Sequence, residues 1–292
     1  MLRRLSMAIV LAASVGRAHA AIDAGAIAKL TGIAPEVQGG VAKVSVPRGD
    51  LHVTVDGVAL APFQGLTSWA AFEEAGDRTV VMGDLVLAED EVSPAMCAAL
   101  DAGLEVTALH NHFAFARPPV FFMHVGGTGP TDALATGVAH ALAAVRAVRA
   151  ASPTPAAGFG GPAVGTPSAI DPKPLEAVLG GTAQAKDGMA KFVFGRTTTA
   201  HGTPLGAAMG VNTWAAFGGS PERAVVDGDF AMLEGELQPV LRALCAAGIH
   251  VVAIHGHMIH EEPRIVFLHF WGTGPAEDLA RGVRRALDAQ RA

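Results

Sequence analysis

The stretch Trp69-Ala70-Ala71-Phe72 recurs as Trp214-Ala215-Ala216-Phe217, at an offset of 145 residues (214 − 69). This offset holds without a gap from Trp69 to Arg146, and upstream an offset of 148 (171 − 23) relates Asp23 to Asp171. Repetition at a fixed offset indicates a duplicated structural unit. The chain is therefore predicted to contain two tandem copies of one domain, over residues 21–149 and 171–292.

Residues 150–170 separate the two copies and are rich in Pro, Gly, Ala and Ser. Such a composition buries too little apolar surface to offset the entropy lost on ordering. We therefore expect a solvated linker, which ends where Asp171 caps the first helix of the second copy.

The first 20 residues have the order of a signal peptide. Arg3 and Arg4 precede an apolar run over residues 5–15, and Ala18-His19-Ala20 forms a small-x-small cleavage signal. We expect cleavage after Ala20 and a secreted or periplasmic protein. The apolar run is too short to span a bilayer, so no transmembrane anchor is expected.

Charge argues against nucleic acid as a partner. Removal of residues 1–20 takes three arginines and no acid, so the formal net charge changes from −6 to −9. An acidic surface repels phosphate backbones. An unknown small molecule is the expected ligand.

Hydrophobic periodicity in the second copy predicts strands over 224–232, 249–257 and 265–270, with helices over 236–247 and 276–289. This β-α-β-β-α order predicts an α+β sandwich, ferredoxin-like or related, with helices on one face of a mainly antiparallel sheet. Because each half is small for a self-sufficient core, we expect the copies to pack face to face as an intramolecular pseudo-dimer.

Each copy carries the same histidine triplet, and these six residues are His110, His112 and His124, then His255, His257 and His269. Residues two apart on a strand share a face. A hairpin centred on Arg117, or on Glu262 in the second copy, places the first and last histidine of each triplet opposite one another. All three imidazoles would then converge, whereas a slip of one residue would send the last to the other face.

Three convergent imidazoles suit a divalent transition metal with an open coordination position, zinc being the first choice. They also suit metal-free acid–base chemistry, and a structural cluster of histidines is the third interpretation. The second triplet is the stronger candidate, because Glu262, Asp229 and Arg264 lie near it in the expected fold as candidate catalytic groups. The matching turn of the first copy, residues 115–119, has no carboxylate.

Several other side chains receive structural interpretations. Cys97 and Cys245 occupy different positions of the repeat, so we expect small buried side chains, with a disulfide as the alternative in an oxidising compartment. Trp69 and Trp214 are expected in the core. The acids at Glu91 and Glu236 are expected to favour a helix start through the helix dipole.

The histidine and tryptophan motifs resemble the LppY/LpqO-like family, a bacterial exported family with a domain of unknown function. The segments that carry the resemblance are Ala108-Leu109-His110-Asn111-His112, Asn212 to Phe217, Asp227-Gly228-Asp229 and Ala253 to Met258. The resemblance covers nearly all of residues 21–290 and implies an exported, duplicated protein without an established activity. Gly256 departs from the family's usual Asn, and no cysteine for a lipid anchor follows the leader.

A fainter similarity is to pterin carbinolamine dehydratases, and it rests on His110, His112, Pro118, His124, Gly127, Asp132 and Leu134-Ala135. It implies metal-free histidine chemistry, although the leader argues against a cytosolic pterin enzyme. Three functions stay open at this point: an exported metal-binding protein, a metal-free dehydratase-like acid–base enzyme, and a non-catalytic envelope binding or scaffold module.

Overall fold

The computed structural model describes residues 22–161 and 163–290. The signal peptide predicted at residues 1–20 lies outside this range. Within the described residues, no helix is both long and apolar enough to cross a bilayer.

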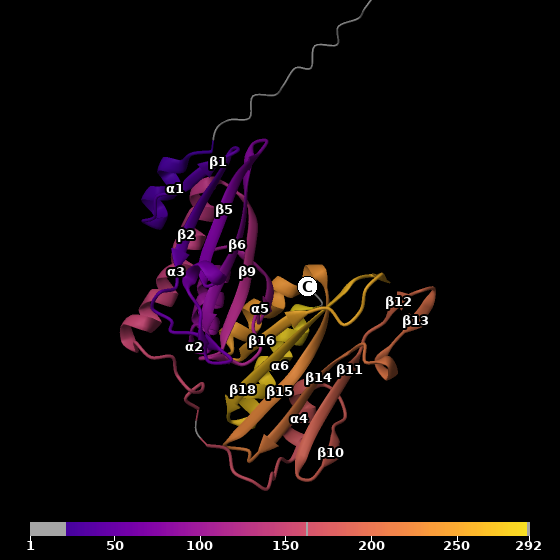
Figure 1. The fold of residues 1–292 in the computed structure, drawn as a ribbon. Coiled ribbons are helices and arrows are strands. Elements are labelled where there is room, and N and C mark those ends of the chain that lie inside the picture. Colours follow the sequence, from indigo (N-terminus) through magenta and orange to yellow (C-terminus); the bar gives the residue numbers. More distant parts are fainter. Residues whose placement is uncertain (1–21, 162, 291–292) are drawn as a thin grey trace, which may run out of the picture.

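Each repeat consists of an antiparallel sheet with helices on one of its faces (Figure 1). The first repeat contains α1 (Ala24–Thr31), β1 (Glu36–Gln38), β2 (Val41–Pro47), β3 (Thr54–Val55), β4 (Val58–Ala59), η1 (Pro62–Gln64), β5 (Thr67–Ala75), β6 (Arg78–Ala88), α2 (Glu89–Asp101), β7 (Glu105–His110), β8 (Ala116–Arg117), β9 (Val120–Gly129) and α3 (Thr131–Ala151).

The second repeat has the same sequence of long elements. It contains α4 (Pro172–Leu179), β10 (Gln184–Lys186), β11 (Met189–Gly195), β12 (Thr198–Ala200), β13 (Thr203–Leu205), η2 (Ala207–Met209), β14 (Asn212–Gly219), β15 (Ala224–Leu233), η3 (Glu234–Glu236), α5 (Leu237–Ala246), β16 (His250–His255), β17 (Glu261–Glu262), β18 (Ile265–Gly274) and α6 (Ala276–Ala289).

The first helix of each repeat starts at a matched aspartate. The Asp23 carboxylate accepts a hydrogen bond from Ala26 N at 2.9 Å, and the Asp171 carboxylate accepts one from Lys173 N at 3.0 Å. Each satisfies a backbone donor that the helix itself leaves free. The expected cap at Asp171 is confirmed.

Both repeats contribute to one 12-stranded sheet, in the order β1-β2-β5-β6-β9-β7-β16-β18-β15-β14-β11-β10. The expectation that the repeats pack face to face is wrong. They join edge to edge where β7 pairs antiparallel with β16 through Leu109 and Ile254. We call this junction the seam. Edge joining satisfies backbone groups that two exposed edge strands would leave unpaired.

The helices α2 and α5 meet behind the seam, and a disulfide joins Cys97 of α2 to Cys245 of α5, with their Cα atoms 5.8 Å apart. The expectation that both cysteines are free and buried is therefore wrong.

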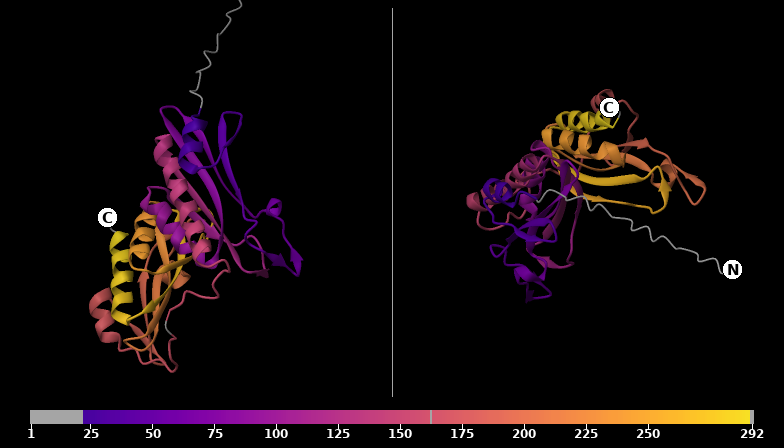
Figure 2. Two further views of the ribbon diagram at one scale, coloured as in Figure 1. Left: turned by 90° about the vertical axis from the view of Figure 1, so that its left-hand side faces the viewer. Right: turned by 90° about the horizontal axis from the view of Figure 1, so that it is seen from above.

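Figure 2 shows how the two repeats are arranged about the seam. The two halves of the sheet turn at the seam, with the helices on the outside and the free sheet faces on the inside.

The α+β class with mainly antiparallel strands is confirmed. The helix-covered face is buried by large side chains such as Phe72, Phe217, Phe230 and Phe270. The ferredoxin-like arrangement is not confirmed, because β2 and β5, like β11 and β14, extend each sheet beyond the expected β-α-β-β-α core.

The segment between the repeats lies against the protein. Helix α3 continues to Ala151, and Ala156 N donates to Asp90 Oδ2 at 3.0 Å. Phe159 stacks on the ring of His250 with 3.9 Å between centroids. The expectation of a freely solvated linker missed these contacts, because the partners of the linker lie far away in the sequence.

Candidate functional site

The three histidines of each triplet converge on the free face of the sheet. In each triplet one ring nitrogen per histidine can be chosen so that all three atoms lie within 4.8 Å of one another. The expected convergence is thus confirmed for both copies. The ring centroid of His255 lies 5.0 Å from that of His257 and 5.0 Å from that of His269.

The expected strand register is wrong by two residues. His124 lies opposite Ala108, and His110 lies opposite Phe122. A register irregularity between Val106 and Ala108 accompanies this displacement. Because two is an even number, the displacement leaves the histidines of the triplet on their expected face. The second repeat shows the same arrangement.

A buried phenylalanine supports the middle histidine of each triplet. The ring of His112 stacks on Phe122 at 3.4 Å between centroids, and that of His257 stacks on Phe267 at 3.5 Å. Both phenylalanines are fully buried, so they fix the position of the ring above them. Sequence reasoning missed this support, although Phe122 and Phe267 share the 145-residue offset.

A buried aspartate lies beside each triplet. Asp229 faces His269 across β15 and β18, and Asp84 faces His124 across β6 and β9. Asp229 Oδ2 lies 3.8 Å from His257 Nε2. The other carboxylate oxygen of each aspartate is buried without a hydrogen-bond partner among the described residues. An unpartnered buried oxygen is costly, and such atoms gather at functional sites.

Burial sets the protonation of this site. It raises the pKa of Asp229 to about 6, against the smaller opposing effect of His269. Burial also lowers the pKa of His255 and of His257, with neighbouring histidines adding to the effect. Both rings are therefore held in the neutral form at pH 7, which is the form that binds metals.

The other predicted site residues lie further out. Glu262 is exposed on β17, which pairs with β12 in a separate three-stranded sheet. Arg264 lines a cavity of about 590 Å³ that also includes His255. Asp227 lines a smaller cavity with His269 and Trp271, and burial raises its pKa. The structure therefore places Asp229 beside the histidine triplet, whereas Glu262 lies in another sheet and is not among the candidate ligands.

The tryptophans lie on the same sheet face as the histidines. Trp69 faces Asp84, and Trp214 faces Asp229. The ammonium of Lys191 lies over the Trp214 ring, 4.2 Å from its centroid, and Lys43 lies over Trp69 at 4.5 Å. The expectation that both tryptophans belong to the core is wrong, because each is partly exposed beneath its lysine.

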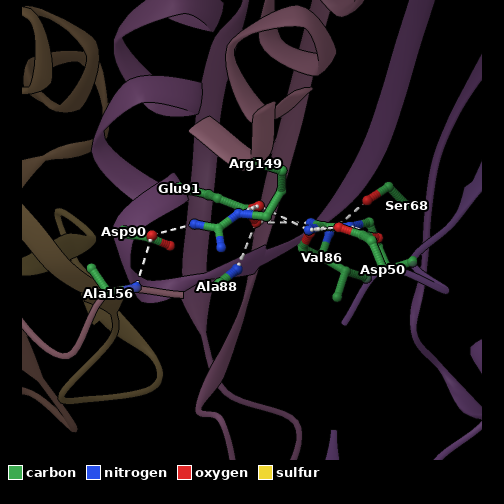
Figure 3. A network of polar contacts seen from close by, with 9 residues as sticks. Asp50, Ser68, Val86, Ala88, Asp90, Glu91, Arg149 and Ala156 are labelled. Carbon is green, nitrogen blue, oxygen red and sulfur yellow. Dashed lines mark hydrogen bonds and ion pairs between the residues drawn. The ribbon is translucent and has the colours of Figure 1, made fainter. Parts of the chain in front are cut away.

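The acids expected at helix starts do lie there, with Glu91 in the first turn of α2 and Glu236 directly before α5, and both also form ion pairs. Figure 3 shows the network around Glu91. Glu91 is fully buried, accepts from Ala88 N, and contacts Arg48 and Arg149, each at 2.8 Å. Arg149 also pairs with Asp90. In the second repeat, Glu236 pairs with Arg196 at 2.8 Å and accepts from Leu233 N. In both repeats the glutamate ties the end of the preceding strand to the start of the helix, so we interpret this repeated network as structural.

Comparison with known proteins identifies a family without an assigned activity. The family model DUF1529, described as Domain of Unknown Function (DUF1259), matches residues 25–144 and 173–289, once in each repeat. No curated protein matches the chain. Among solved structures, a trimeric bacterial microcompartment shell protein, PduB, matches over 88% of this chain and 90% of its own, with 14% identity and a TM-score of 0.22. A similarity this weak carries no argument about fold or function.

Proposed function

This chain belongs to the duplicated family described as Domain of Unknown Function (DUF1259), and from that premise we propose that His255, His257 and His269 bind one divalent transition metal, with zinc preferred. The observation that carries the proposal is the approach of three imidazole nitrogens to within 4.8 Å of one another.

The donor set fits such an ion. Nitrogens bound to zinc at about 2.0–2.1 Å in a tetrahedron lie about 3.4 Å from one another, so the three nitrogens, which lie within 4.8 Å of one another, are close to the spacing that zinc requires. The depressed pKa values of His255 and His257 keep both rings neutral and able to bind. The buried carboxylate of Asp229 offsets the charge of a cation at this place.

A metal held by three histidines keeps an open position, where it can polarise a carbonyl or phosphoryl oxygen or activate a water. Neighbouring residues hold the metal-binding imidazoles in position. Phe267 holds the ring of His257 from below, and Asp229 lies against its Nε2 atom. We prefer the second triplet because Arg264 and Asp227 line cavities that touch it, whereas Pro119 and Met82 stand at those positions in the first repeat.

A metal-free acid–base enzyme is the second candidate. It is favoured by the raised pKa of Asp229, about 6, beside histidines whose pKa values are lowered, since groups that titrate near neutral pH serve proton transfer. We further propose that the protein is LppY/LpqO-like, exported, and acts in the envelope or outside the cell.

Elemental analysis of the untagged mature protein tests the metal proposal. One equivalent of zinc or another transition metal is expected, and His257→Ala should remove it while the circular dichroism spectrum stays unchanged. His112→Ala, at the matched position of the first repeat, is the control and should leave the second site loaded. If the wild-type protein neither contains metal nor binds added zinc, the proposal fails and the acid–base candidate takes its place.

A further inference from the structure

The seam opens into a cleft on one side of the Leu109–Ile254 pair. Its volume is about 590 Å³, and it is bounded by β7 of the first repeat and by η3, α5, β16 and the start of β18 of the second. Figure 2 shows that the two halves of the sheet turn relative to each other at the seam. We call this the open seam cleft, and its polar side chains are Glu105, Thr107, Glu234, Gln238, His255 and Arg264.

The pseudo-symmetry of the seam creates a matching cleft on the other side. The 145-residue offset relates Glu105 to His250, Glu234 to Glu89 and Gln238 to Ser93. His250, Glu89 and Ser93 line a second cavity, whose remaining wall is the linker segment Ala156–Gly160. We call this the linker cleft.

The linker shows what the seam accommodates. Ala156 N donates to Asp90 at the rim of the linker cleft, and Phe159 stacks on His250. Phe159 also lines a pocket with Val252 and Ala253, which correspond to Thr107 and Ala108 of the open seam cleft. A polypeptide segment therefore lies against one side of the seam, and no described segment of the chain lines the corresponding cleft on the other side in the same way.

The charged side chains of the open seam cleft fit a ligand that carries a positive charge at one end and a negative charge at the other. Over residues 22–161 and 163–290, neither Glu105, Glu234 nor Arg264 forms an ion pair. Arginine recognises carboxylates through two parallel hydrogen bonds, and carboxylates recognise ammonium groups. At the equivalent repeat positions His250 replaces Glu105 and Pro119 replaces Arg264, so the other side of the seam has no arginine at the position that would bind a carboxylate.

We propose that the open seam cleft binds a short peptide with free ends, whose carboxylate pairs with Arg264 and whose ammonium group pairs with Glu105 and Glu234. The size of the cleft is in the range of small-ligand sites, about 300–1,000 Å³. This binding requires no metal. Where the metal proposal also holds, His255 places such a peptide at the metal centre, and the peptide is then its substrate class.

Titration of the metal-free, full-length mature protein with tetra-alanine tests the inference, read from backbone amide NMR signals. Saturable shifts are expected at Glu105, Thr107, Gly235 and Gly256. Tetra-alanine acetylated at one end and amidated at the other should bind at least about tenfold more weakly, because the charged contacts are lost. Absence of saturable shifts with the free peptide, or equal binding of the two forms, overturns the proposal.

Two variants locate the charged ends. Arg264→Gln should weaken binding of the free peptide about tenfold, and amidation of the peptide should then cause no further loss of affinity. The double variant Glu105→Gln/Glu234→Gln should likewise make acetylation of the peptide cause no further loss. Glu89→Gln in the linker cleft is the matched control and should change nothing. If both cleft variants bind like the wild type, the assignment is wrong. Because every measurement uses metal-free protein, its outcome is separate from that of the metal proposal.

Discussion

Leu109 and Ile254 occupy the same position in the two repeats, 145 residues apart (254 − 109), and they pair with each other across the seam. A residue that pairs with its own counterpart marks a two-fold axis. The repeats are therefore related as the subunits of a symmetric dimer are, although one chain contains both. The axis also places both histidine triplets on the same side of the sheet, one on each flank of the seam.

The disulfide should stabilise the junction of the repeats. Replacement of both Cys97 and Cys245 by Ser is expected to lower the free energy of unfolding by about 2–5 kcal/mol, because the bond closes a long loop. Urea unfolding measures the change, and a reducing agent should reproduce it in the wild-type protein. Unchanged unfolding in both tests would show that the non-covalent contacts of the seam suffice.

The matched glutamates Glu91 and Glu236 should contribute differently to the free energy of unfolding. Glu91→Gln removes the fully buried charge that Arg48 and Arg149 share, leaving them only Asp50 and Asp90, and should cost about 3 kcal/mol. Glu236→Gln affects one partly exposed arginine and should cost about 1–2 kcal/mol. Chemical unfolding of both variants checks the order, and a larger loss from Glu236→Gln would contradict the burial argument.

Asp229→Asn should stabilise the metal-free protein at high pH. Burial raises the pKa of Asp229 from 3.8 to about 6, so the folded state carries the charge at a cost of about 1–3 kcal/mol above pH 6. The cost fades as pH falls through 6 and is absent below 3.8, where both states are protonated. Melting temperatures at pH 8 and pH 4 test this prediction, and an equal gain at both would contradict it. In the same variant, zinc affinity should fall.

The histidines should make metal binding persist into mild acid. The pKa values of His255 and His257 lie below the ordinary 6.5, so proton competition begins at lower pH than for free imidazole. As pH falls through 6.5, the unfolded chain takes up protons that the folded rings resist, and the metal-free protein loses stability. Metal release to a chelator, followed against pH, should have its midpoint below 6.5. Release above 6.5 would be inconsistent with neutral, partly buried rings.

The convergence of the triplets was predictable because it depends only on alternation along strands. His110 and His112, like His255 and His257, share a face for that reason, and an error of two residues in the register did not matter. The duplication was equally accessible, since the offset can be read directly from Trp69 and Trp214.

Contacts between distant segments were not predictable in the same way. Glu91 meets Arg48 across 43 residues, and neither residue carries a local signal of burial. Cys97 and Cys245 differ in repeat position, so the offset concealed their approach. Only the two-fold axis at the seam, which brings α2 against α5, explains their bond.

The seam also determines where the sheet ends. Its outermost strands are β1 and β10, each three residues long and exposed, whereas β7 and β16 lie paired in the middle. An unpaired strand edge attracts further strands and promotes polymerisation. Fusion of the repeats thus removes the two edges most able to recruit another molecule. A fragment that contained one repeat alone would expose such an edge, and it should self-associate where the intact chain remains a discrete particle.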